Sequence, residues 1–97
     1  MLSVKLTPAA KADVNDAYDW YESILPGLGA QFNEEVVAAI SRIEANPRMT
    51  APVFEDVRRV LLRKFPYVLF FHVETEAVYI IACFHGSRDP KIWQSRT

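Results

Sequence analysis

The sequence predicts an α+β domain, in which an antiparallel helical hairpin packs on one face of a small antiparallel sheet. Two stretches with apolar residues at helical spacing come first, and three strand-like runs follow them. With a short strand in front, the predicted order is strand, helix, helix, strand, strand, strand, and then a short C-terminal helical tail. The 97 residues form a single domain, residues 1–97, with a composition that is 51% hydrophobic and 24% charged, as in ordinary globular proteins.

The first strand and helix are marked by a short apolar run and a helix-start signal. Val4-Lys5-Leu6 is the strand candidate, and Thr7-Pro8 is typical of a helix start, with Thr as N-cap and Pro at the first helical position. The residues that then recur at steps of four and three form one apolar face: Ala10, Val14, Ala17, Tyr21 and Ile24. Trp20 lies next to this face and is expected to flank the core. The carboxylates on the other side are expected to be solvated: Asp13, Asp16, Asp19 and Glu22.

The second helix follows a break at residues 26–29, where Pro and Gly interrupt the pattern. Its apolar face comprises Phe32, Val36, Ala39, Ile40 and Ile43. It is expected to stop around Asn46-Pro47, because Pro disfavours helical geometry in the residue before it. Such a short connection makes the two helices an antiparallel hairpin, and residues 48–56 are expected to form an irregular loop.

The three later strands are predicted at Val57 to Phe65, Tyr67 to Glu74 and Ala77 to Phe84, with a tight hairpin at Glu74-Thr75-Glu76. The last two are apolar on both faces, because consecutive side chains alternate across a strand and nearly all of them are hydrophobic. Two helices cover only one face of a small sheet. The second face is therefore expected either to curl in on itself or to be covered by a partner.

Composition and charge exclude several classes of protein. No apolar stretch approaches the length of a membrane span, and the N-terminus does not resemble a signal peptide. Cys83 is the single cysteine, so no intrachain disulfide can form. These observations together predict a cytoplasmic protein with no membrane association. No motif for a cofactor or spacing for a metal site is present, so neither is expected. The net charge of −1 is unevenly divided: residues 1–56 carry four Lys or Arg against nine Asp or Glu, net −5, whereas residues 57–97 carry seven against three, net +4.

The candidate site lies in the basic half, where the last strand opens into a tail, residues 85–96, that contains a His, three cations and a Trp. His85 and Arg88 follow the last strand, and the first strand of the three carries four cations: Arg58, Arg59, Arg63 and Lys64. Arginine forks bind phosphate or carboxylate groups, and a histidine beside them suits general acid–base cleavage of RNA. The competing interpretation is structural: a hydrogen-bonded His85, and a Trp93 that packs on the core.

The chain resembles toxins of the ParE/RelE superfamily, from type II toxin–antitoxin (plasmid stabilisation) modules. The resemblance rests on the order and spacing of the segments 4–10, 19–21, 43–47, 58–60, 65–71 and 85–90. It implies a helical hairpin on a small sheet and a cognate antitoxin whose C-terminal segment wraps the toxin. It also implies one of two activities, because RelE-like members cleave mRNA on the ribosome and ParE-like members poison DNA gyrase.

The sequence of the tail is more similar to those of ParE-like members than to those of RelE-like members. The net charge is near zero, Lys64 is the only lysine between residues 48 and 65, and no Tyr or His follows Arg88 to act as a late base. The resemblance thus implies a gyrase inhibitor without side-chain catalysis, with the following residues at the contact with the target: Arg58, Arg63, His85, Arg88 and Trp93. Two alternatives remain: a ribosome-dependent mRNA endonuclease with His85 as acid or base and Arg58, Arg63 and Arg88 around the phosphate, and an inactive remnant that only binds the antitoxin. A homodimer is also left open.

Overall fold

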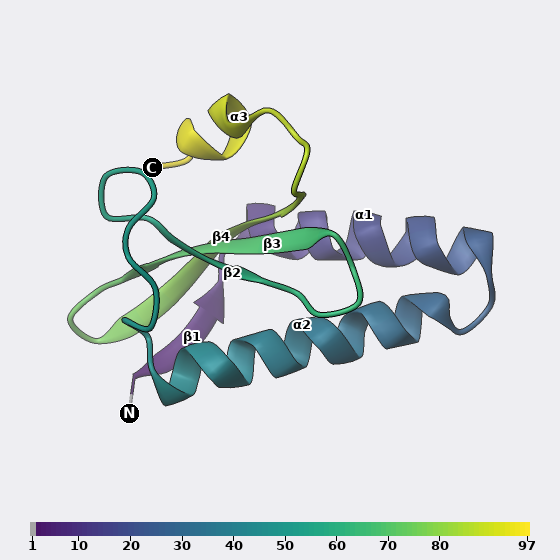
Figure 1. Cartoon of the computed structure of the whole chain (residues 1–97), viewed down its shortest axis with the longest axis horizontal. Coiled ribbons are helices and arrows are strands. Elements are labelled where there is room, and N and C mark those ends of the chain that lie inside the picture. Colours follow the sequence, from purple (N-terminus) through teal and green to yellow (C-terminus); the bar gives the residue numbers. More distant parts are fainter. Residues whose placement is uncertain (1) are drawn as a thin grey trace.

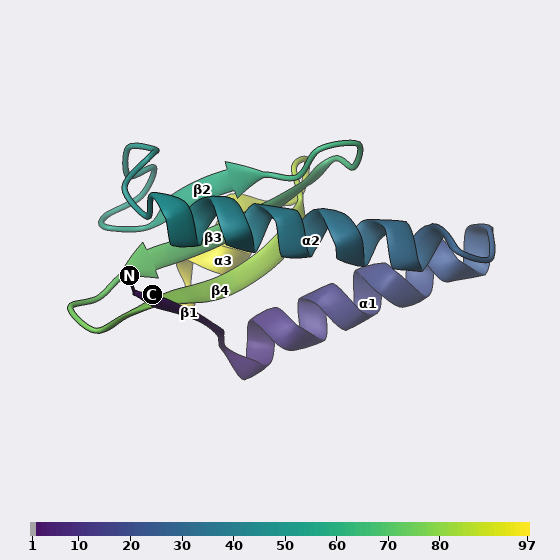
Figure 2. The ribbon, with the colours of Figure 1, turned by 90° about the horizontal axis from the view of Figure 1, so that it is seen from below.

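The α+β architecture predicted above is present in the computed structural model, which describes residues 2–97. The elements in chain order are β1 (Ser3–Leu6), α1 (Pro8–Ile24), α2 (Leu28–Ala45), β2 (Arg58–Leu61), β3 (Tyr67–Val73), β4 (Ala77–His85) and α3 (Pro90–Gln94). The hairpin of α1 and α2 lies on one face of the sheet, and α3 lies over the other face (Figure 1 and, from below, Figure 2). No helix among these residues is long and apolar enough to span a membrane.

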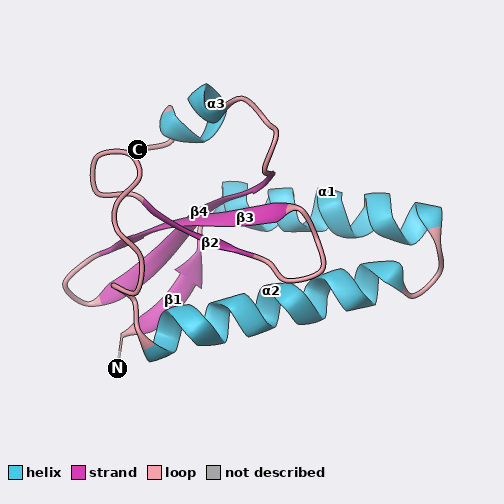
Figure 3. Ribbon diagram, viewed as in Figure 1, coloured by secondary structure: helices cyan, strands magenta, loops and turns pink. Residues whose placement is uncertain are grey.

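The sheet has the strand order β1-β4-β3-β2. The pairs β2–β3 and β3–β4 are antiparallel as expected, whereas β1 runs parallel to β4, with Val4 opposite Val78 and Leu6 opposite Ile80. The sheet is therefore mixed, a feature that the residue pattern of β1 does not encode because alternation is the same in either direction. Figure 3 shows β1 beside β4, and Figure 2 shows the long loop that precedes β2 at the other edge of the sheet.

The start of α1 and the hairpin turn follow from local chemistry. The Oγ1 of Thr7 accepts a hydrogen bond from the Ala10 N–H at 3.2 Å, which confirms the predicted N-cap. Gly27 has a φ of 92° and has no side chain to cap α2. The carboxylate of Glu22 takes that role, because it accepts hydrogen bonds from the N–H groups of Gly27 at 3.1 Å and Gly29 at 2.9 Å.

Gly29 also allows the two helices to approach closely. A Cβ atom at this position would lie 2.9 Å from the ring and from the carbonyl oxygen of Tyr18. We therefore expect Gly29→Ala to lower the free energy of unfolding by about 1–3 kcal/mol through overpacking. Gly86→Ala is the matched control, because its Cβ would meet nothing closer than the Pro66 oxygen at 3.6 Å. Equal urea midpoints for the two variants would contradict the close helix contact.

A cluster of buried side chains lies on each face of the sheet. The hairpin-side core contains residues from α1, α2 and the sheet, among them Phe32, Ile43, Leu69, Phe71, Val78 and Ile80. The tail-side core contains Val57, Val68, Phe70, Ile81, Ala82, Phe84 and Trp93. Both faces of the sheet are thus buried, and each face contributes to the free energy of folding roughly in proportion to its apolar area.

The second face is covered by the chain's own tail, which corrects the expectation of a curled sheet or a partner. Asp89 caps α3 by accepting a hydrogen bond from the Lys91 N–H at 3.0 Å, and Pro90 occupies its first turn. Trp93, which is 6% exposed, stacks on Phe70 with ring centroids 4.1 Å apart. The predicted packing role of Trp93 is therefore confirmed.

Three other expectations were wrong. The first strand of the meander does not reach Phe65 but ends at Leu61, before a turn in which Lys64 adopts a φ of 68°. Trp20 does not flank the core, because it is 61% exposed on α1. Asp13 is not solvated: its carboxylate pairs with the guanidinium of Arg96 at 2.6 Å and accepts a hydrogen bond from the Cys83 N–H at 3.0 Å. These partners are 70 and 83 residues away, so helical periodicity alone does not reveal them.

Candidate target-binding site

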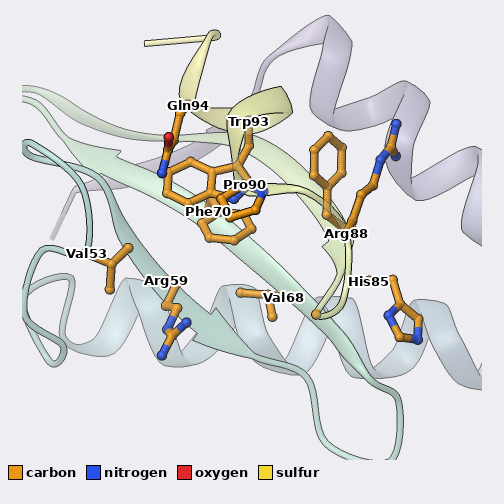
Figure 4. Close-up of a pocket in the computed structure, with 11 residues that line it drawn as sticks. Val53, Arg59, Val68, Phe70, His85, Arg88, Pro90, Trp93 and Gln94 are labelled. Atoms are coloured by element: carbon orange, nitrogen blue, oxygen red, sulfur yellow. The ribbon is translucent and has the colours of Figure 1, made fainter.

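A cavity of about 240 Å³ lies between α3 and the tail-side face of the sheet (Figure 4). Residues of β2, β3 and β4 form its wall together with the turn after β4 and with α3. Its lining residues are Val53, Arg59, Val68, Phe70, Phe84, His85, Gly86, Arg88, Pro90, Trp93 and Gln94. The structure thus brings three of the predicted site residues, His85, Arg88 and Trp93, to one place.

Aromatic side chains form part of the wall of this cavity, which we call the tail cavity. Trp93 forms one side, held between the stacked ring of Phe70 and the edge of Phe54, whose centroid is 5.8 Å away. The buried ring of Phe84 also lines the cavity. Such a rigid aromatic surface suits the insertion of an apolar side chain from a partner.

The rim of the tail cavity carries positive charge. The guanidinium of Arg88 lies over the Phe84 ring, 4.1 Å from its centroid, in a cation–π contact. In Figure 4, Arg59 lies on the other side of Val68 from Arg88, and the guanidinium of Arg88 points away from Trp93, towards α1. Among residues 2–97, no carboxylate lies within ion-pair distance of either guanidinium. The two cations are therefore available to a carboxylate or phosphate that sits beside an apolar group.

His85 is held by a hydrogen-bonded turn. Its Nδ1 accepts a hydrogen bond from the Ser87 N–H at 3.1 Å and lies 2.8 Å from the Ser87 Oγ. Because a backbone N–H only donates, Nδ1 carries the lone pair and the proton of the neutral ring is on Nε2. The imidazole is thus a structural hydrogen-bond acceptor whose outer nitrogen is a donor. This arrangement does not present a free base to a substrate.

The two remaining predicted residues lie outside the cavity. The guanidinium of Arg58 donates to the carbonyl oxygen of Thr50, and so ties the long loop to β2. Arg63 is exposed in the turn after β2. Their neighbour Arg59, which belongs to the same basic set in the sequence but was not among the predicted contact residues, lines the cavity instead. Alternation gives the signal that places it, because the side chain of Val60 packs in the hairpin-side core and that of Arg59, the residue before it, must face the other way.

A smaller cavity, of about 180 Å³, adjoins the same turn between α1 and β4. It shares His85 and Arg88 with the tail cavity and adds Asp13, Asp16, Ala17, Tyr67 and Cys83. Burial raises the pKa of Tyr67, and the charge of Arg88 only partly opposes this effect. The phenol therefore stays protonated at neutral pH. No cluster of three or more His, Cys, Asp or Glu side chains within residues 2–97 is placed to hold a metal ion.

Cys83 is expected to be inert in the folded protein. Burial, followed by the nearby charge of Asp13, raises the pKa of the thiol to about 12. Because the unfolded thiol titrates at a lower pH, the contribution of Cys83 to stability is complete below about pH 8.5 and is lost as the pH rises towards 12. Labelling with an aromatic disulfide reagent at pH 8 is expected to follow global unfolding. Rapid labelling without denaturant would contradict this burial.

Both the sequence and the fold are similar to those of known proteins. The family model described as the ParE toxin of the type II toxin–antitoxin system, parDE, matches residues 4–90. The chain is 32% identical over 79 residues to Toxin ParE2 of Mycobacterium tuberculosis, from both strain CDC 1551 / Oshkosh and strain H37Rv, and the match covers 80% of this chain and 75% of the relative. Its fold is similar to that of a chain in the chromosomal ParDE TA system from P. aeruginosa, with a TM-score of 0.78, 21% identity, and coverage of 88% of this chain and 96% of that one.

Proposed function

Because the chain belongs to the ParE toxin family of type II toxin–antitoxin systems, we propose that a cognate antitoxin neutralises it and that the free toxin inhibits DNA gyrase by binding through the tail cavity. The observation that carries the proposal is the pair of unneutralised guanidinium groups, Arg59 and Arg88, on the rim of an aromatic cavity. A cavity of this kind recognises an apolar side chain beside an acidic group on a protein surface. We place the toxin in the cytoplasm, where gyrase acts.

The chemistry around the tail turn supports inhibition by binding rather than by catalysis. General acid–base cleavage of RNA requires a group that accepts a proton near neutral pH. The Nδ1 lone pair of His85 is engaged by Ser87, and burial raises the pKa of Tyr67. Arg58, which the endonuclease alternative requires around the phosphate, is bound to the Thr50 carbonyl. These contacts favour inhibition of gyrase over ribosome-dependent cleavage of mRNA as the function.

Expression in bacterial cells tests the proposal as a whole. We expect growth arrest that co-expression of the antitoxin relieves, together with induction of the DNA-damage response, because a trapped gyrase leaves broken DNA. Growth arrest with cleaved mRNA and no DNA damage would support the endonuclease instead. A well-folded protein that binds antitoxin but leaves growth unaffected would support the inactive remnant.

The tail cavity itself is tested by Arg88→Ala. Hydrogen bonds to charged groups contribute about 1.5–3 kcal/mol, so we expect this variant to weaken gyrase inhibition by about tenfold or more. The control is Lys64→Ala, which removes an exposed cation whose one ion pair within the described residues 2–97, with Glu35 at 3.8 Å, contributes little to stability. Both variants are checked for an unchanged Tm. Full inhibition by Arg88→Ala would remove the cavity from the proposal.

A further inference from the structure

The smaller cavity, of about 180 Å³, lies between α1 and β4, and we call it the α1 cavity. Tyr67 and His85 are directly opposite each other in the register of β3 and β4, so both side chains lie on the same face of the sheet. Their rings meet edge to face, with centroids 5.6 Å apart. Arg88 reaches the same cavity from the turn after β4, and its guanidinium points towards α1 (Figure 4). Two strands and a turn thus bring three polar side chains into one cavity.

Each of these three side chains offers a hydrogen-bond donor. The phenol of Tyr67 is protonated at neutral pH, because burial raises its pKa. The guanidinium of Arg88 lies close enough to this phenol for its charge to lower the same pKa in part. The neutral ring of His85 carries its proton on Nε2, because Nδ1 accepts the hydrogen bond from the Ser87 N–H. The α1 cavity therefore combines two neutral donors with a charged one.

The rest of the chain does not use these donors. Among residues 2–97, no group forms a hydrogen bond with the Tyr67 hydroxyl or with the Arg88 guanidinium, and no carboxylate lies within ion-pair distance of Arg88. Of the two carboxylates in the wall, Asp13 is paired with Arg96 at 2.6 Å, whereas Asp16 is exposed and forms no ion pair within the described residues. The charge of Arg88 is therefore available to an external carboxylate, to which its planar fork donates two parallel hydrogen bonds.

We propose that the α1 cavity binds an acidic side chain on the surface of gyrase, with Arg88, Tyr67 and His85 as donors to its carboxylate. This inference rests on the gyrase inhibition proposed above and deepens it, because it states where the acidic group of the target binds. The α1 cavity and the tail cavity share His85 and Arg88, so they adjoin at the turn after β4. One segment of the target thus reaches both cavities, with an apolar side chain against the aromatic wall and a carboxylate beside Tyr67.

The charges around the α1 cavity favour a protein carboxylate over the phosphates of a nucleic acid. Asp16 lines the cavity, and Asp19 is exposed three residues further along the same helix. A nucleic acid carries a negative charge at every nucleotide, so its successive phosphates would meet these carboxylates. A single acidic side chain has no neighbouring charges to bring against them. Asp16 also selects a cationic or amide group beside the carboxylate of the target, because it accepts hydrogen bonds and carries a negative charge.

Titration of the full chain with acetate, followed by NMR, tests the site in the absence of gyrase. Acetate carries the proposed carboxylate on a single methyl group. We expect the signals of the Arg88 side chain and of the His85 ring to shift and to saturate. Tyr67→Phe removes only the hydroxyl and keeps the ring, which packs against Phe32 with centroids 5.2 Å apart. The expected loss of acetate affinity in this variant is about three- to tenfold, as for one neutral hydrogen bond.

Two further variants make the titration specific. Tyr79→Phe is the matched control, because it removes the hydroxyl of a tyrosine that lines neither cavity, and we expect a change of less than about 1.5-fold. Asp16→Asn removes a negative charge from the wall and is expected to tighten acetate binding by about twofold. An acetate affinity that neither Tyr67→Phe nor Asp16→Asn changes would overturn the inference. Tighter binding of a short DNA duplex, weakened by Tyr67→Phe, would also overturn it, because the ligand would then be a phosphate.

The supercoiling activity of gyrase connects this site to the proposed function. We expect Tyr67→Phe to raise the inhibitory concentration of the chain by about threefold or more, and Tyr79→Phe to leave it unchanged. Full inhibition by Tyr67→Phe would overturn the inference and leave the inhibition of gyrase intact. Acetate binding by an unsubstituted chain that does not inhibit gyrase would instead overturn the proposed function, and with it gyrase as the partner.

Discussion

Trp93→Ala is expected to lower the free energy of unfolding by about 3 kcal/mol or more, as truncations of buried aromatic residues do. The indole fills the space between α3 and the sheet and contacts both Phe70 and Phe54. Its removal takes away the principal apolar contact that holds a five-residue helix against the tail-side core. A helix of that length is not stable alone, so α3 is expected to detach.

The control for Trp93→Ala is Ile92→Ala, in the same helix. Ile92 is 39% exposed and lies outside the tail-side core, so its truncation is expected to cost less than about 1 kcal/mol. Urea unfolding measures the stability of both variants, and binding of a dye that recognises exposed apolar surface reports the loss of α3 from the sheet. Equal stabilities, with no dye binding by Trp93→Ala, would show that the tail is not part of the folded core.

Asp13→Ala is expected to have a comparable effect, of about 3 kcal/mol, through a different mechanism. The Asp13 side chain is 10% exposed and that of Arg96 is 25% exposed, and removal of one member of a mostly buried ion pair leaves the other charge without compensation. The substitution also leaves the Cys83 N–H without its acceptor. Asp19→Ala, on the exposed side of the same helix, is the matched control and is expected to change stability by less than about 0.5 kcal/mol.

A double-mutant cycle separates the ion pair from its neighbours. The variants are Asp13→Ala, Arg96→Ala and the combination of the two. Because each single variant leaves one charge unpaired, the combined loss is expected to be smaller than the sum of the two single losses. Additive losses would contradict the coupling between the first helix and the end of the tail.

The helical hairpin and the meander were predictable because their signals are local. Thr7-Pro8 defines a helix start within a few residues, and residues 26–29 define the break between the helices. The alternation in β3 and β4 also identified both faces as apolar. What covers the second face was not predictable, because a five-residue helix has too short a pattern to show which surface it packs against.

The site was only partly predictable, for a related reason. His85, Arg88 and Trp93 come together because they lie on one continuous tail. Arg59 enters from β2, so its place depends on the register of a distant strand pair rather than on its neighbours in sequence. The Asp13–Arg96 pair is invisible to any local pattern, since it joins residues 83 positions apart.

The proposed inhibition of DNA gyrase by the free chain can be measured directly. The most direct measurement is a supercoiling assay with purified gyrase and relaxed plasmid, with the purified chain added alone or together with antitoxin. We expect the chain to block supercoiling or to trap cleaved DNA, and the antitoxin to relieve the effect. Normal supercoiling in the presence of a folded chain that arrests growth in cells would contradict the proposal.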